Sequence, residues 1–150
     1  MATGKITPSL TIVRQYQSTP DKVWNSWTTS AALKQWMAPS RDFTTTVVEL
    51  DVRVGGRYRI NMKGPDGAEH DISGVYRRVT PQRKLEFTWS WKSTPERESL
   101  VVIELRPTAQ GTELTLTHSQ FLDQEACDRH NEGWHGCLGQ LDQFLLLSAA

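Results

Sequence analysis

The chain has 150 residues, which suits one domain with a substantial buried core, and we treat residues 1–150 as a single domain. Hydrophobic residues make up 37% of the chain and charged residues 23%, as is ordinary for a soluble globular protein. Seventeen basic residues balance seventeen acidic ones, so no overall field favours nucleic acid or an anionic membrane, and neither is an expected partner.

The first part of the chain predicts a strand followed by two short helices. Residues 10–16 alternate as a strand, with Arg14 on its otherwise apolar face. A helix is expected over residues 20–27, because proline suits the first helical position. A second helix should run from residue 31 to residue 36 or 37 and end before the proline that follows.

From residue 43 onward the apolar residues recur with period two, which is typical of strands with one buried face. The segment Gly64-Pro-Asp-Gly67 is a strong turn signal between two of these strands. Six strands are expected, over residues 43–51, 57–62, 69–79, 85–91, 98–106 and 112–119.

The last segment, Asp123 to Leu147, has the spacing of a long amphipathic helix. Asp123 is a suitable N-cap. Gly133, Gly136 and Gly139 disfavour a helix, so either a bend at residues 132–134 or one continuous helix fits the sequence. The apolar face carries Ala126, Cys127, His130, Trp134, Cys137, Leu138, Leu141, Phe144 and Leu145.

These elements predict an α+β fold, in which a curved, seven-stranded antiparallel sheet wraps around the long C-terminal helix. The two short helices lie between the first and second strands. Three strands would offer an inward wall rich in aromatic residues. Between wall and helix there must be either a packed core or a ligand cavity.

Several short motifs resemble, in their order and spacing, a known family. They are Arg14, Pro20-x-x-Val23-Trp24, Leu33-x-x-Trp36-x-x-Pro39, Glu49-Leu-Asp51-Val-Arg53-Val-Gly55-Gly56, Gly74-Val-Tyr76, Leu85-x-Phe87-x-Trp89, Thr112-x-Leu-Thr-Leu-Thr-His118 and Gly133-Trp134. The chain resembles, from about residue 9 to residue 146, the bacterial homologues of the activator of the Hsp90 ATPase. That family belongs to the START-like (SRPBCC) superfamily with a helix-grip fold. The resemblance implies a cavity between helix and sheet, but its relatives include lipid carriers, hormone receptors, cyclases and chaperone partners, so the fold does not select an activity.

We therefore expect a non-enzymatic domain without a cofactor that binds a small hydrophobic or amphipathic molecule in this cavity. One alternative is a protein-interaction module that contacts a chaperone. Another is an enzyme that acts on an aromatic or cyclic substrate through His118. The expected ligand-binding residues are Tyr58, Ile60, Met62, Tyr76, Phe87, Trp89, Trp91, His118, Trp134, Leu138 and Leu141.

Two inward polar residues need partners. His118 alternates with leucines and should be tied to a backbone or side-chain group, although it could also act as acid, base or ligand donor. Arg14 is expected to form a salt bridge with Glu49 or Asp51, or else to bind a ligand carboxylate. The segment from Asp51 to Gly56 predicts a tight hairpin fixed by an Asp–Arg pair, because no helix N-terminus is there to make it a phosphate loop.

Metal binding and disulfide formation are both disfavoured. Cys127 and Cys137 would lie about 15 Å apart on one helix, beyond disulfide reach. Cys127 and His130 could supply only two metal ligands, with Cys137 too distant. Free thiols, with no leader peptide or membrane span evident in the sequence, indicate a cytoplasmic protein.

Overall fold

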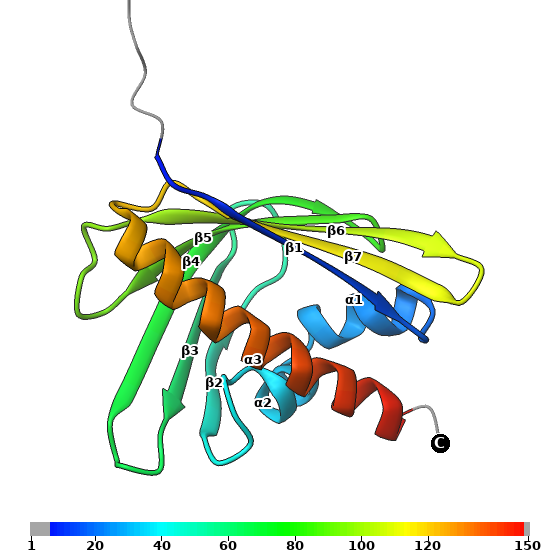
Figure 1. Ribbon diagram of the computed structural model, residues 1–150, viewed down its shortest axis with the longest axis horizontal. Helices are drawn as coiled ribbons and strands as arrows, with labels where there is room; N and C mark the ends of the chain where they lie inside the picture. The colour runs from blue at the N-terminus through cyan, green and yellow to red at the C-terminus, as the bar shows by residue number, and fades with distance from the viewer. Residues whose placement is uncertain (1–6, 149–150) are drawn as a thin grey trace, which may run out of the picture.

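Seven antiparallel strands form one sheet, and a long helix crosses its concave side, in the computed structural model, which describes residues 7–148 (Figure 1). Two short helices lie beside the long one (Figure 1). In chain order the elements are β1 (Leu10–Tyr16), α1 (Pro20–Thr28), α2 (Ser30–Trp36), β2 (Thr44–Leu50), β3 (Arg57–Lys63), β4 (Glu69–Thr80), β5 (Lys84–Trp91), β6 (Ser99–Thr108), β7 (Gly111–Ser119) and α3 (Gln124–Ser148).

The strand order in the sheet is β1-β7-β6-β5-β4-β3-β2. Strands β2 to β7 therefore form a meander, and β1 joins it through β7. Register shifts between Val47 and Glu49 and between Tyr76 and Arg78 interrupt the ladders. Because such bulges bend and twist a strand, they help the sheet to curl around α3. The predicted helix-grip fold is confirmed.

Helix α3 is continuous, so the glycines in its middle do not break it. The Asp123 carboxylate caps it by accepting a hydrogen bond from the Ala126 N–H at 2.8 Å. Gly136 lies against the backbone of Pro39, in the segment after α2, and a Cβ at this position would collide with the Pro39 carbonyl. The glycine thus permits a close approach that a helical wheel, which places it on the polar face, does not indicate.

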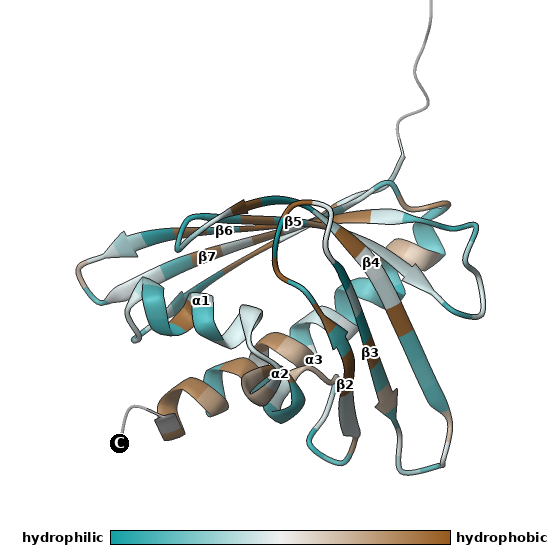
Figure 2. Cartoon of the chain, turned by 180° about the vertical axis from the view of Figure 1, so that it is seen from behind, coloured by the Kyte–Doolittle hydropathy of each residue, from teal (hydrophilic) through white to brown (hydrophobic). Residues whose placement is uncertain are grey.

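Alternating strand residues supply the core, and Figure 2 shows apolar and polar residues following one another along β3 and β4. The predicted inward faces of β3, β5 and β7 are buried, apart from Trp91, which is half-buried. Trp134 of α3 packs within 6.0 Å of the Trp27 ring and 5.0 Å of the Trp89 ring, measured between ring centres. The apolar stripe of α3 therefore faces the sheet as expected.

The predicted salt bridge of Arg14 with Glu49 or Asp51 is wrong. Arg14 is on β1, whereas the acidic residues lie on or just after β2, at the opposite edge of the sheet. Alternation along a strand indicates its face but not its neighbours, which explains the error. Arg14 instead donates from Nη2 to Nδ1 of His135 on α3, at 2.7 Å.

Two local predictions are confirmed. The Asp51 carboxylate accepts a hydrogen bond from Nε of Arg53 at 2.8 Å, within the tight connection between β2 and β3. Cys127 and Cys137 are free thiols, and both are buried. Within residues 7–148, no helix combines the length and the apolar character needed to cross a membrane.

A cavity under the N-terminal half of the long helix

A cavity of about 800 Å³ lies between α3 and the sheet, toward the N-terminal end of the helix. Its lining comes from α3, from residues at or near one end of each of the strands β3 to β6, and from three connections: residues 37–43, 93–98 and 120–122. Aromatic rings dominate the apolar part of the wall. These rings belong to Phe43, Trp89, Trp91, Phe121 and Trp134.

Two tryptophan–histidine hydrogen bonds fasten the wall of the cavity. The indole N–H of Trp134 donates to Nδ1 of His118 at 2.9 Å, and that of Trp91 donates to Nε2 of His130 at 2.9 Å. An indole nitrogen can only donate, so each of these histidine nitrogens must carry a lone pair. The protonation pattern of both rings follows from this.

His118 is fully buried and neutral. Because its Nδ1 accepts, its proton is on Nε2, which lies 2.7 Å from the Ser99 hydroxyl and donates to it. Ser99 in turn donates to the Trp89 carbonyl oxygen at 3.3 Å. Burial, and secondarily the charge of a protonated His130, lowers the pKa of His118 to about 2. In this tautomer His118 cannot remove a proton from Ser99, so the pair lacks the arrangement of a nucleophile and its base.

His130 is half-buried and is held in the opposite tautomer. Its Nδ1 donates to the Ala126 carbonyl oxygen at 2.7 Å, while Nε2 accepts from Trp91. Burial lowers its pKa, partly offset by the bond to Ala126. Since both nitrogens of both rings are engaged, neither histidine has a lone pair free for a metal. Residues 7–148 contain no group of three or more His, Cys, Asp or Glu side chains arranged to hold a metal ion.

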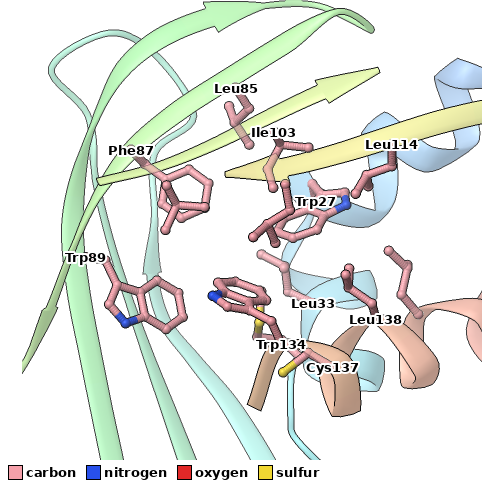
Figure 3. Packing of buried hydrophobic residues seen from close by; sticks show 14 of the residues in the cluster. Trp27, Leu33, Leu85, Phe87, Trp89, Ile103, Leu114, Trp134, Cys137 and Leu138 are labelled. Carbon is pink, nitrogen blue, oxygen red and sulfur yellow. The ribbon is translucent and has the colours of Figure 1, made fainter. Parts of the chain in front are cut away.

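The third cavity tryptophan, Trp89, differs from the other two. Its indole nitrogen is buried and has no hydrogen-bond partner. Figure 3 shows this nitrogen on the side of the ring turned away from Phe87. Among the described residues, Trp27 Nε1 is the one other buried side-chain nitrogen or oxygen without a partner, and Trp27 does not border the cavity.

Charges at the rim of the cavity balance one another. The lining includes two acidic residues, Glu96 and Glu98, and two basic ones, Arg97 and Arg129. Glu98 lies 3.6 Å from Arg77, and Arg129 lies 4.0 Å from Glu125, in exposed ion pairs that contribute little to stability. The rim therefore has no net preference for an anion or a cation.

The predicted ligand-binding residues divide into two groups. Met62, Trp89, Trp91 and Trp134 border the cavity. The other members are buried around it without forming its wall, because the side chains from the middle of the sheet are already packed against α3 and one another. These are Tyr58, Ile60, Tyr76, Phe87, His118, Leu138 and Leu141.

Much of the remaining lining was not predicted. Phe121 lies in the connection between β7 and α3, and its ring centre is 4.9 Å from that of His130. An apolar residue directly after a strand, and a histidine within the apolar stripe of α3, were the available signals. The loop at residues 93–98 carries no comparable pattern, since its polar residues are typical of any exposed connection.

The curved sheet, the long C-terminal helix and the cavity between them define a helix-grip domain. The chain belongs to the family of Activator of Hsp90 ATPase homolog 1-like proteins, whose sequence profile matches residues 17–145. Comparison with curated proteins finds no match.

Several solved bacterial structures are similar to this one. The AHSA1 protein SPO3351 from Silicibacter pomeroyi is 27% identical with a TM-score of 0.84, covering 94% of this chain and 99% of that one. Protein NE0264 from Nitrosomonas europaea is 26% identical with a TM-score of 0.78, and the similarity covers 93% of this chain and 95% of that one. Protein CV1439 from Chromobacterium violaceum has a TM-score of 0.84, and the similarity covers 91% of this chain and 96% of that one. At 24% identity it shows a similarity of fold alone.

Proposed function

We propose that this domain binds a small apolar or amphipathic molecule in the cavity under the N-terminal half of α3. The observation that carries the proposal is a space of about 800 Å³ walled by aromatic rings within an otherwise closely packed interior. Protein cores contain few voids larger than a water molecule, whereas ligand sites measure roughly 300–1,000 Å³. The fixed histidines support the same reading, because they hold the tryptophans in place.

Two glycines of α3 provide a matched test. Gly133 borders the cavity and Gly139 does not, and a Cβ at either position meets no atom within 4 Å. Leucine at position 133 should occupy the cavity and weaken binding of an anilinonaphthalene sulfonate dye by about tenfold or more, roughly 1.4 kcal/mol. Leucine at position 139 should leave dye binding unchanged, although it removes the same helix-disfavouring residue.

Dye fluorescence titration and thermal unfolding of the three proteins give the readout. Saturable binding that raises the melting temperature of the wild type, and is lost only in Gly133→Leu, supports the proposal. Equal dye binding by all three proteins would place the dye elsewhere on the surface and reject this cavity as the site.

A second candidate function is contact with another protein, such as a chaperone of the kind named in the family description. The observation in its favour is an exposed apolar pair, Leu146 and Leu147, near the end of α3. Addition of the protein to an Hsp90 ATPase assay, with Leu147→Ser as the comparison, tests this candidate. Stimulation that the substitution abolishes would favour it over the carrier role, and no stimulation would remove it.

A further inference from the structure

Trp91 differs from the other tryptophans of the cavity because it borders two hollows. The first is the cavity described above. The second measures about 550 Å³ and has a lining that is polar apart from Trp91. His70, Trp91 and Ser93 belong to both linings, so the two hollows adjoin at these three residues. His70 and Ser93 are exposed, whereas Trp91 is half-buried at the last position of β5.

One hydrogen bond fastens the side chain of Trp91. Its indole N–H, the one polar group of the side chain, donates to Nε2 of His130 on α3 at 2.9 Å. The ring centres of Trp89, His130 and His70 lie 5.6, 5.9 and 6.4 Å from that of Trp91. The bond to His130 therefore ties the end of β5 to the helix that roofs the cavity.

Protonation of His130 removes this bond. Nδ1 already carries a proton, which it donates to the Ala126 carbonyl oxygen at 2.7 Å, so a second proton can only go to Nε2. An imidazolium has two N–H donors and no acceptor. The indole N–H of Trp91 and the new Nε2–H would then point at each other, and the indole has to move away.

The other tryptophan–histidine bond of the wall is not sensitive in this way. His118 is fully buried and its pKa is lowered to about 2, so its bond from Trp134 persists in mildly acidic solution. His130 is half-buried and borders the cavity. Burial lowers its pKa, and release of Trp91 exposes the ring and raises the pKa again. Protonation therefore favours the released state.

The charges around His130 oppose one another. Arg129 on the same helix disfavours a second proton. His118 of β7, with its ring centre 5.0 Å away, stays neutral. Cys127 and Cys137 stay thiols, because burial raises the pKa of both. The other titratable or charged side chains of the cavity lining are His70, Glu96, Arg97 and Glu98. Among these lining residues, the two carboxylates favour an imidazolium and the arginine disfavours it.

We propose that Trp91 is a gate between the two hollows, latched by His130, and that protonation of His130 opens the gate and releases the ligand. This inference rests on the proposed function, because the gate closes the same cavity. It adds an acid-sensitive route of exchange through the polar hollow, while the bond from Trp134 to His118 holds the rest of the wall in place.

The first experiment needs neither a ligand nor a substitution. NMR spectra of the wild-type protein follow the Trp91 indole signal and the His130 ring signals between about pH 8 and 4.5. The Trp91 indole proton should move upfield with the same midpoint as His130, because it loses its acceptor. The Trp134 indole signal should stay in place. A Trp91 signal that does not follow His130, or a His130 ring that stays neutral throughout, overturns the inference and leaves the carrier role standing.

The second experiment measures release of phenylnaphthylamine, an uncharged apolar dye, by stopped-flow fluorescence. Dissociation from the wild type should be about tenfold faster at pH 4.5 than at pH 8, the effect of losing one neutral hydrogen bond. Trp91→Phe keeps a ring without the donor, and should release the dye at the fast rate at both pH values. His130→Gln keeps an acceptor that does not titrate, and should release it at the slow rate at both. His70→Gln is the matched control, because it removes the other histidine of the lining and should keep the response to pH.

The outcomes separate this inference from the proposed function. A response to pH that persists in His130→Gln, or slow release from Trp91→Phe at pH 8, overturns the gate while the carrier role stands. If the dye does not bind the wild type at pH 8, the proposed function fails for uncharged apolar ligands of this size and the inference fails with it. Where circular dichroism shows that a variant is unfolded, the wild-type spectra decide.

Discussion

The two halves of α3 meet the same sheet in different ways. In the C-terminal half, Leu138 and Leu141 are 0% exposed, and the Tyr16 hydroxyl of β1 donates to the Leu138 carbonyl oxygen at 3.0 Å. In the N-terminal half, His130, Gly133 and Trp134 roof a cavity of about 800 Å³. We call these the packed half and the hollow half.

The difference lies in what each half faces. The packed half lies against β1 and beside α1, and Figure 3 shows Leu138 pointing from α3 toward Leu114 of β7 and Trp27 of α1. The hollow half faces strand ends and connections, including residues 93–98 and 120–122. One apolar stripe with constant spacing can therefore fill a core at one end and cover a ligand-sized space at the other.

The largest effect is expected at the boundary between the halves. Trp134→Ala should lower the free energy of unfolding by about 3–5 kcal/mol, because it removes a buried indole and its hydrogen bond to His118. Urea denaturation followed by circular dichroism measures the loss. A midpoint equal to that of the wild type would mean that Trp134 does not hold the two halves together.

A pair of enlarging substitutions tests the comparison directly. Leu138→Trp should cost about 1–3 kcal/mol or more, because the packed half has no space for a larger ring. Met62→Trp should stay within about 1 kcal/mol of the wild type, since Met62 borders the cavity and the indole can extend into it. The same urea experiment compares them, and equal losses would show that the halves are packed alike.

Acid should act mainly around the hollow half, because His130 belongs to it and His118 of β7 accepts a hydrogen bond from its Trp134. Burial lowers the pKa of His118 from 6.5 to about 2, so the unfolded chain takes up a proton in this window while the folded chain does not. Stability should therefore decrease as the pH falls below about 6, by about 1.4 kcal/mol per pH unit from this residue.

Urea unfolding at a series of pH values gives the slope, and the ring signals of His118 in NMR spectra give the cause. Those signals should not change between about pH 8 and 5 while the protein stays folded. A His118 ring that titrates in the folded protein would contradict the buried hydrogen-bond chain from Trp134 to Ser99.

The smallest expected effect comes from two glycines of α3 that differ only in their surroundings. Gly139→Ala should stabilise the protein by up to about 1 kcal/mol, because its Cβ enters open space and alanine favours the helix. Gly136→Ala should instead destabilise it, since the Cβ collides with the Pro39 backbone. Thermal unfolding of both variants suffices, and stabilisation by both would show that the segment after α2 yields easily.

The fold was largely predictable from the sequence because period-two strands and a stripe with helical spacing are local patterns. The face of each strand was predicted on the same basis, as the buried Ile60, Phe87 and Leu116 show. The partner of Arg14 was not predicted, because which residues lie beside β1 depends on the order of the strands in the sheet. Continuity of α3 through Gly133 was also undecidable, since tertiary packing outweighs helix propensity there.

The cavity was predictable as a region but not as a set of residues. Inward-facing aromatics suggested a wall, but whether Phe87 packs in the core or borders a space depends on how far α3 lies from each strand. That distance is governed by contacts such as Gly136 against Pro39, which the sequence does not encode as a pattern. The unpartnered N–H of Trp89 likewise emerges only when every neighbouring acceptor has been assigned.

The pairing of β1 with β7 has a consequence for the order of assembly. Leu10 lies opposite His118, so the first strand cannot dock until the last strand has left the ribosome. The meander from β2 to β7 can form strand by strand, and β1 then pairs with the free edge of β7. Helix α3 follows β7, and its Leu138 carbonyl accepts a hydrogen bond from Tyr16 of β1, so the helix that roofs the cavity and the first strand dock late and together.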